Sequence, residues 1–253
     1  MKEIYESGEI WLGDCLELMK DIPEKSMDMI ICDLPYQTTS CEWDCIIPFE
    51  PLWEQYWRVL KPNAAVVLTA SQPFTTALIS SQMKHFKYTW VWEKEQGVNF
   101  MLSKKQPLKV HEDVVVFSKN THRYFPVMER GVRYISGKGS SGEVTGNVKK
   151  TQTTNIGTRY PKSIIKINRE TGLHPTQKPV ALFEYLIRTY TIEGETVLDN
   201  CSGSGTTAIA AMNTDRRFIN IEKDENYYNI SKERVKKHQK ETHHVDGLEK
   251  FFE

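Results

Sequence analysis

The 253-residue chain has no apolar run that approaches the roughly 18 residues a membrane span requires. Its first residues, MKEIYESGEIWL, lack a charged region followed by an apolar core, so a secretory signal is not expected. Hydrophobic residues make up 39% and charged residues 26% of the chain, which suits a globular protein with one buried core. The sequence therefore predicts a cytoplasmic protein without membrane contact.

Cysteine is scarce, and paired metal-ligand spacing is missing. The five cysteines are an odd number spread over apolar and loop segments, which is typical of free thiols in a reducing compartment. Cys41 and Cys45 could supply two of the four ligands of a zinc site, but no second Cys or His pair stands at matching spacing. No metal is therefore expected.

A net charge of zero conceals an uneven distribution along the chain. Between Lys119 and Arg169, eleven Lys or Arg stand against two acidic residues, so this segment has a net charge of about +9. A basic run of this kind fits either a solvated loop or a surface for an acidic partner. Composition alone does not choose between the two.

Apolar strand-like runs alternate with helix-length segments on both sides of the basic segment. This alternation predicts an α/β fold with a mostly parallel sheet and helices on both faces. Residues 119–170 interrupt the pattern and are predicted to be an insertion between residues 1–118 and 171–253. The predicted strands are 27–32, 64–69, 88–93, 113–118, 195–200 and 217–222, and the predicted helices are 49–60, 73–83, 179–190, 206–212 and 225–240.

One strand-to-helix connection indicates a ligand loop. In TVLDNCSGSGTTAIAA, residues 196–211, an apolar strand ends at Asp199, a turn with Gly203 and Gly205 follows, and Thr206 begins a helix. No Lys follows the second glycine and no third glycine is present, so neither a phosphate loop nor a dinucleotide fingerprint is matched. The next predicted strand ends in Glu222, where an acid is expected to accept hydrogen bonds from ribose hydroxyls.

Another predicted strand ends in IICDLPYQTT, residues 30–39. The Asp33 carboxylate and the Leu34 carbonyl can accept both hydrogens of an amine on a flat heterocycle, and Tyr36 can stack on its ring. Such an amine is a poor nucleophile because its lone pair is delocalised. Two acceptors that hold its hydrogens localise that pair and stabilise the developing positive charge, so this motif predicts amine activation.

Three motifs together resemble the β-class amino methyltransferases of DNA. They are DLPY at 33–36, HPTQKP at 174–179 and VLDNCSGSGTT at 197–207, with the catalytic motif ahead of the cofactor loop. Two departures stand out: Leu34 replaces the usual first proline, and Cys201 replaces the usual phenylalanine against the cofactor. Pro35 still restricts Leu34 to extended geometry, so its carbonyl is expected to stay aimed at the amine.

The resemblance implies a seven-stranded, Rossmann-like methyltransferase sheet, S-adenosylmethionine as cofactor and double-stranded DNA as partner. It assigns catalysis to Asp33, Leu34, Pro35 and Tyr36, which would hold a flipped base. Residues 119–170 occupy the place of the target-recognition region, with Lys149, Lys150 and Arg159 as DNA contacts. It assigns cofactor binding to Asp14, Cys15, Asp33, His174, Thr176, Lys178, Asp199, Cys201, Ser202, Gly203, Gly205, Thr206, Thr207 and Glu222.

The expected reaction is adenine N6 methylation, as in restriction-modification enzymes. Asp33 favours adenine because the family more often has serine at this position for cytosine. Cytosine N4 methylation, RNA or protein methylation, and a DNA-binding protein without catalysis stay open as alternatives. The sequence also leaves open whether the chain forms a homodimer.

Overall fold

The computed structural model describes residues 1–37, 45–137, 139–140, 149–170, 172 and 177–249, with the backbone alone for 139–140, 149–150 and 242–249. These residues form two compact units, one of Met1–Phe125 with Ser163–Glu253 and the other of Pro126–Lys162. Among the described residues, no helix combines the length and apolar character needed to span a membrane.

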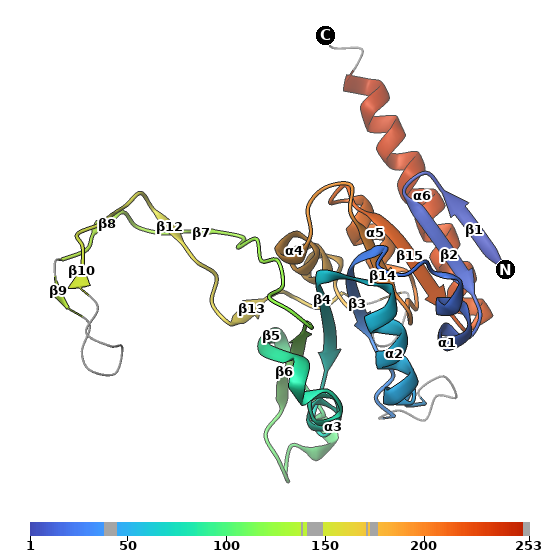
Figure 1. The fold of residues 1–253 in the computed structure, drawn as a ribbon, viewed down its shortest axis with the longest axis horizontal. Helices are drawn as coiled ribbons and strands as arrows, with labels where there is room; N and C mark the ends of the chain where they lie inside the picture. Colours follow the sequence, from blue (N-terminus) through green and yellow to red (C-terminus); the bar gives the residue numbers. More distant parts are fainter. Residues whose placement is uncertain (38–44, 138, 141–148, 171, 173–176, 250–253) are drawn as a thin grey trace. The chain divides into compact units, whose positions relative to one another are not determined.

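A nine-stranded sheet forms the centre of the first unit (Figure 1). Its strands lie in the order β1-β2-β15-β14-β3-β4-β6-β5-β13. Strand β1 is antiparallel to β2, and β6 is antiparallel to both β4 and β5, whereas the other five pairings are parallel. The strands are β1 (Lys2–Tyr5), β2 (Gly8–Leu12), β3 (Met27–Asp33), β4 (Leu60–Ala70), β5 (Phe86–Val98), β6 (Lys109–Phe117), β13 (Ile164–Lys166), β14 (Thr196–Asp199) and β15 (Arg217–Glu222).

The strand order creates a crevice between β3 and β14. These two strands pair in parallel, with Leu198 opposite Ile30. From β3 the chain crosses to β4 on one side, whereas from β14 it crosses to β15 on the other side. Loops that leave adjacent parallel strands in opposite directions open a gap at their carboxyl ends, which is where α/β sheets bind ligands. The predicted site residues Asp33 and Asp199 end these two strands.

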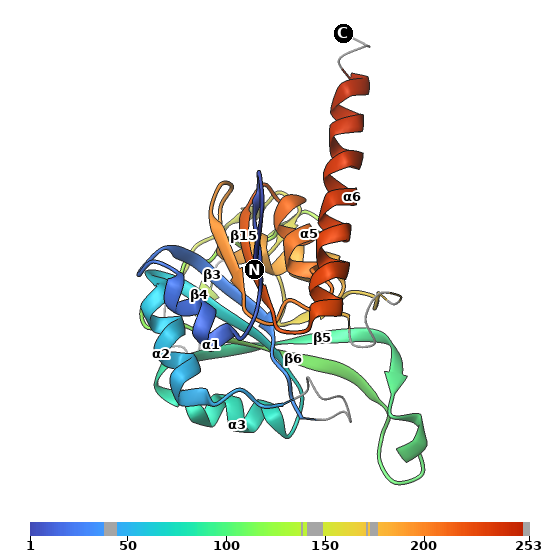
Figure 2. The same ribbon diagram turned by 90° about the vertical axis from the view of Figure 1, so that its right-hand side faces the viewer.

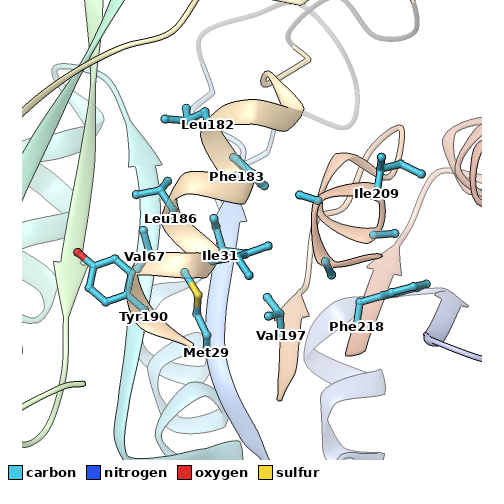
Figure 3. Packing of buried hydrophobic residues seen from close by; sticks show 14 of the residues in the cluster. Met29, Ile31, Val67, Leu182, Phe183, Leu186, Tyr190, Val197, Ile209 and Phe218 are labelled. Carbon is cyan, nitrogen blue, oxygen red and sulfur yellow. The ribbon is translucent and has the colours of Figure 1, made fainter. Parts of the chain in front are cut away.

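Helices cover both faces of the sheet (Figure 2). Successive side chains of a strand point to opposite faces, so Ile30 packs with the first helix group and Ile31 with the second. Figure 3 shows Met29, Ile31 and Val67 against helix α4. The first group is α1 (Cys15–Leu18), α2 (Phe49–Val59) and α3 (Phe74–Ser81), and the second is α4 (Val180–Tyr190), α5 (Thr206–Met212) and α6 (Glu225–Glu249).

Burial on both faces explains why the central strands could be predicted from the sequence. The strand MDMIICD is almost wholly buried, and each fully buried Ile or Met contributes about 1.5–3 kcal/mol to stability. All six predicted strands and all five predicted helices are confirmed, with ends shifted by a few residues. Three short 3-10 helices, η1 (Met19–Asp21), η2 (Met83–His85) and η3 (Phe100–Leu102), were not predicted.

The predicted strand number of seven is wrong, because the sheet has nine strands. Strands β1 and β2 form an edge hairpin in which no residue of β1 and three residues of β2 are buried, so no continuous apolar run marks it. Strand β13 pairs in parallel with β5 although it lies inside residues 119–170, which the sequence assigned to an insertion. It was missed because its three residues, of which only Ile165 is buried, are too short to show a pattern.

The second unit, Pro126–Lys162, is a long antiparallel ribbon of three short ladders. Glu129 pairs with Arg159, Tyr134 with Asn155, and Gly139 with Lys150. It lies within the predicted insertion but is shorter than it at both ends. Its strands are β7 (Glu129–Arg130), β8 (Tyr134–Ile135), β9 (Gly139–Ser140), β10 (Lys149–Lys150), β11 (Thr154–Asn155) and β12 (Thr158–Arg159).

Candidate active site

A cavity of about 1250 Å³ opens at the carboxyl ends of β3, β14 and β15. It brings together most of the predicted site residues from five separate parts of the sequence. Gly205 and Thr207 do not line it, and His174 and Thr176 lie outside the described residues. The predicted residues that line it are Asp14, Cys15, Asp33, Leu34, Pro35, Tyr36, Lys178, Asp199, Cys201, Ser202, Gly203, Thr206 and Glu222.

Both oxygens of the Asp33 carboxylate are held by neighbours. The Tyr36 hydroxyl donates to Oδ1 at 2.5 Å, and the Thr69 hydroxyl on β4 donates to the same oxygen. The Lys178 ammonium donates to Oδ2. Burial, and then the Asp33 charge, raise the pKa of the Tyr36 phenol well above its ordinary value, so this group stays a donor. The carboxylate at the tip of β3 is therefore fixed in orientation.

The Tyr36 ring has an aromatic partner within the protein, which the sequence did not indicate. It stacks on the Phe74 ring at a centroid distance of 4.9 Å and an interplanar angle of 28°. Phe74 begins helix α3 and is buried, so it supports the ring from the protein side. Offset aromatic pairs of this kind contribute about 0.5–1.5 kcal/mol. Tyr36 still lines the cavity, where a flat ligand can contact it.

A buried chain of charges continues from Asp33 across the sheet. Lys178 Nζ lies 3.4 Å from Glu112 Oε2, an ion pair, and Lys94 donates to Glu112 Oε1. Burial by itself lowers the pKa of the Lys178 ammonium, but the carboxylates of Asp33 and Glu112 outweigh burial and raise it. Burial likewise raises the pKa of Glu112, but Lys178 and Lys94 outweigh it and lower that pKa. Opposite charges therefore keep Lys178 and Glu112 ionised inside the protein.

Sequence reasoning missed Thr69, Lys94 and Glu112. Thr69 lies within the predicted strand 64–69, whereas Lys94 and Glu112 lie one residue outside the predicted strands 88–93 and 113–118. Lys94 on β5 and Glu112 on β6 belong to paired antiparallel strands, and only this pairing brings their charges together. The charged residues in the first half of β6, KVHED, ahead of its buried VVVF, are the one signal that could have indicated Glu112.

The loop after β14 is built around Asp199. Its Oδ1 accepts the Cys201 N–H at 3.0 Å, and its Oδ2 accepts the Thr207 hydroxyl. Thr207 therefore supports the carboxylate from the side of helix α5. Burial raises the pKa of Asp199 to about 7, because these hydrogen bonds only partly replace its hydration. A cationic ligand group in the cavity would favour the ionised form of this acid.

Gly205 has a structural role where the sequence interpretation gave it a ligand role. It caps the start of α5 with a φ of +82°, a conformation that favours glycine. A Cβ at this position would lie 2.3 Å from the Ser231 side-chain oxygen of α6. Gly205 therefore lets helix α5 pack closely on α6, and this packing sets the position of the loop.

Glu222 stands across the loop from Asp199. Its carboxylate accepts the Gly203 N–H at 2.6 Å and the Asp224 N–H at 2.8 Å. Burial raises its pKa, so a ligand that donates hydrogen bonds to it would replace lost hydration. Beside it, the buried Ser202 Oγ has no hydrogen-bond partner among the described residues. These polar groups fit a ligand with hydroxyl groups and a cationic group.

Asp14 faces the same cavity but also caps helix α1. Its Oδ1 accepts the N–H groups of Leu16 and Glu17, and Lys223 Nζ lies 3.6 Å from its Oδ2. The resemblance assigns Asp14 to cofactor binding, and about half of its side chain stays accessible for such a contact.

Three thiols gather behind the loop, which the sequence did not indicate. Cys201 is hydrogen-bonded to Cys15 and to Cys32 at the end of β3. Burial raises the pKa of Cys32 to about 12, and the hydrogen bond to Cys201 together with burial raises that of Cys15. These thiols therefore stay protonated at neutral pH and are not nucleophiles. Among the described residues, no group of three or more His, Cys, Asp or Glu could hold a metal ion.

The three predicted DNA contacts lie in the second unit. Lys149 and Lys150 form β10, of which the structure describes the backbone. Arg159 is part of the ribbon itself: it donates to the Val132 carbonyl and to Asn155 Oδ1, and its guanidinium lies 4.6 Å from the centre of the Tyr134 ring. The structure thus gives Arg159 a role in holding the ribbon together.

Comparisons with known proteins agree with this arrangement. Residues 27–233 match the DNA methylase family that joins N6 and N4 enzymes. The type II methyltransferase M2.DpnII of Streptococcus pneumoniae is 28% identical over 263 residues, covering 92% of each chain. The type II methyltransferase M.HpaI of Haemophilus parainfluenzae is 25% identical over 236 residues, covering 88% of this chain and 72% of its own.

Two solved structures have the same fold. The complex of M1.HpyAVI with SAM has a TM-score of 0.61 at 23% identity and covers 90% of this chain and 99% of its own. The cytosine-N4-specific DNA methyltransferase PvuII has a TM-score of 0.66 at 17% identity and covers 89% of this chain and 85% of its own. At these identities the likeness concerns the fold.

Proposed function

Because the chain belongs to the N6/N4 DNA methylase family, we propose that it methylates the N6 amine of adenine in double-stranded DNA, with S-adenosylmethionine as the methyl donor. The observation that carries this proposal is the fixed Asp33 carboxylate, which shares one cavity with Asp199 and Glu222. An amine acceptor and a pocket for a cationic, hydroxyl-bearing cofactor thus lie side by side at the crevice of the sheet.

Each end of the cavity has a distinct part in the reaction. When bound, S-adenosylmethionine would supply a methyl group made electrophilic by its sulfonium, whose sulfur keeps the electron pair of the broken S–CH3 bond and leaves as a neutral thioether. Asp199 would hold the cofactor's ammonium and Glu222 its ribose hydroxyls, with Ser202 as a further partner. At the other end, Asp33 and the Leu34 carbonyl would accept the two amine hydrogens of the target base, which Tyr36 would contact through its ring.

Asp33 then has two successive tasks. As the amine attacks, its nitrogen becomes positive, and the carboxylate stabilises that charge more strongly in the transition state than in the ground state. The methylated nitrogen next loses one proton to restore conjugation with the ring. An ammonium attached to such a ring is a stronger acid than a carboxyl group, so Asp33 Oδ1 or Oδ2 can take the proton. The target base must leave the duplex stack for this geometry.

The test of the proposed function is product identification. A plasmid from a methylation-deficient host is incubated with the protein and labelled S-adenosylmethionine, and its nucleosides are then separated. Label in N6-methyl-2′-deoxyadenosine is the expected result. Label in N4-methyl-2′-deoxycytidine would assign the second reaction of the family, and unlabelled DNA would contradict both.

Removing the Asp199 carboxylate should weaken cofactor binding. Asp199→Ala loses a charge-assisted contact to the cofactor's ammonium, worth about 1.5–3 kcal/mol, so the dissociation constant should rise roughly 10- to 100-fold. Titration calorimetry measures this directly. Asp21→Ala, which removes an exposed carboxylate, is the control and should leave the dissociation constant unchanged.

The same carboxylate predicts a pH dependence. The pKa of Asp199 is raised to about 7, and binding of an ammonium favours the ionised acid. Affinity should therefore fall as the pH drops below 7, by up to about tenfold per pH unit, with proton release on binding. Asp199→Ala should remove this dependence. An unchanged dissociation constant and slope in the variant would mean that Asp199 only supports the loop.

The second unit predicts salt-dependent DNA binding. Replacing Lys149 and Lys150 with alanine should raise the dissociation constant for duplex DNA and flatten its salt dependence by up to about two units of slope, because two phosphate contacts would be lost. A binding series at several salt concentrations is the measurement. The matched control replaces the exposed Lys20 and Lys237 of the first unit. Equal slopes for wild type and the Lys149/Lys150 variant would assign these lysines to a solvated face.

A further inference from the structure

The loop between β5 and β6 presents apolar side chains to solvent. Phe100 is 78% exposed and Met101 98% exposed, the highest value among the large hydrophobic residues of the described part of the chain. Leu102 and Leu108, in the same loop, are also exposed. Figure 2 shows β5 and β6 running together to this loop, beyond the helices that cover the sheet. Adjacent exposed apolar residues of this size mark an interaction surface.

The backbone of this loop is ordered by its own hydrogen bonds. Asn99 has a φ of +66° and starts the η3 turn, where its carbonyl accepts the Leu102 N–H at 2.9 Å. The Leu102 carbonyl in turn accepts the Lys105 N–H at 2.8 Å. The turn therefore holds Phe100 and Met101 outward instead of letting them fold back onto the protein. An ordered loop loses little further conformational freedom on binding.

The loop begins and ends at the wall of the active-site cavity. Val98 and Asn99 precede the apolar tip, Gln106 and Lys109 follow it, and all four line the cavity that contains Asp33. The exposed tip therefore stands at the entrance through which a target base would pass. None of the residues that the structure describes in the second unit lines this cavity, so the placement rests on residues of the first unit.

The charge around the tip suits a polyanion. Residues 99–110 contain Lys104, Lys105 and Lys109 and no acidic residue. Lys104 and Lys105 are exposed next to the apolar side chains. Proteins that unstack DNA combine apolar wedges, often Phe, Leu, Ile or Met, with basic residues on the adjoining phosphates.

We propose that Phe100 and Met101 form a wedge that enters the DNA duplex and occupies the space vacated by the target base, while Lys104 and Lys105 contact the flanking phosphates. This inference rests on the proposed function. The wedge favours the extrahelical state because apolar side chains replace the stacking that the neighbouring bases lose. Its effect should therefore depend on how strongly the target base is paired.

The experiment compares two DNA duplexes that contain the site methylated by the wild-type protein, as mapped on a plasmid from a methylation-deficient host. In one duplex the target base is paired, and in the other it faces a mismatched base, which lowers the cost of flipping. Phe100→Ala/Met101→Ala should lower kcat/KM roughly 10- to 100-fold on the paired duplex and less than about threefold on the mismatched one. The control variant, Met83→Ala/Ile192→Ala, removes exposed apolar residues elsewhere and should match wild type on both.

Cofactor affinity, measured by calorimetry, reports whether the cavity wall is intact. If the double variant changes the cofactor affinity, the single variant Met101→Ala is used in place of the double variant. The Met101 side chain is almost fully exposed, so its removal does not disturb packing. Equal activity of variant and wild type on the paired duplex would overturn the wedge, as would an equal loss on both duplexes. If the wild-type protein sediments as a dimer and the double variant as a monomer, the wedge would be overturned in favour of a self-association surface. If the wild-type protein methylates neither adenine nor cytosine in any DNA, the proposed function is overturned, and the wedge with it.

Discussion

Replacing Asp33 with alanine is expected to lower the rate constant for methyl transfer by roughly a thousandfold, while the dissociation constant of S-adenosylmethionine stays within about twofold of the wild-type value. Asp33 lies at the tip of β3, and in the proposed reaction its contact to the target amine would strengthen as positive charge develops on nitrogen. The proposed cofactor contacts come from Asp199 and Glu222, which end other strands. Single-turnover kinetics with saturating DNA measures the transfer step.

Two further variants define what the loss means. Asp33→Asn keeps the shape and one acceptor oxygen but removes the charge, so its rate should fall between those of wild type and Asp33→Ala. Thr69→Val removes one of the donors that orient Oδ1 and should reduce the rate about tenfold. Wild-type turnover in Asp33→Ala would contradict the assignment of this acid, and a matching loss of cofactor binding would mean that the cavity had changed.

Lys178→Met is expected to lower both activity and stability. Lys178 is buried between Asp33 and Glu112, so its removal leaves two carboxylates without their shared cation. Breaking such a buried pair costs about 3–5 kcal/mol of unfolding free energy. Asp33 also loses the donor to Oδ2, and the rate constant for methyl transfer should fall roughly 100-fold. Urea unfolding at pH 7.5 and single-turnover kinetics are the measurements.

The pH dependence distinguishes this ion pair from simple loss of packing. The folded protein lowers the pKa of Glu112, so that carboxylate contributes stability above its unfolded pKa, and the contribution is lost as the pH falls through the lower folded value. The raised pKa of Lys178 means that its own contribution is complete below about pH 10. The difference in unfolding free energy between wild type and Lys178→Met should therefore have its full value at pH 7.5 and shrink below about pH 4.5.

The control for this variant is Lys237→Met, which removes an exposed lysine of α6 that pairs with Glu241. Exposed pairs of this type contribute little, so its unfolding free energy should stay within about 0.5 kcal/mol of wild type. A Lys178→Met protein as stable and active as wild type would show that Asp33 is oriented by Tyr36 and Thr69 alone.

The local sequence by itself determined six of the nine strands of the main sheet, five helices of the first unit and the acids that end three of these strands. Strands β3 and β14 are short apolar runs buried on both faces, and a carboxylate follows each run at the point where the sheet ends. Parallel strands place their carboxyl ends at one edge, so Asp33, Asp199 and Glu222 could be assigned to a common site. The three acids do line one cavity. The strand ends could be predicted because a burial pattern is a property of a short segment.

The tertiary structure decided which groups meet at that edge. Lys178 reaches Asp33 across 145 positions of sequence, and Glu112 joins them from a strand in the middle of the chain. Gly205 looked like a ligand-binding glycine, but packing against Ser231 explains it. Ion pairs and close packing depend on the order and register of strands, and hydrophobic periodicity in a single segment contains no information on either. For the same reason the exposed tip at Phe100 and Met101 became visible only when the cavity beside it was known.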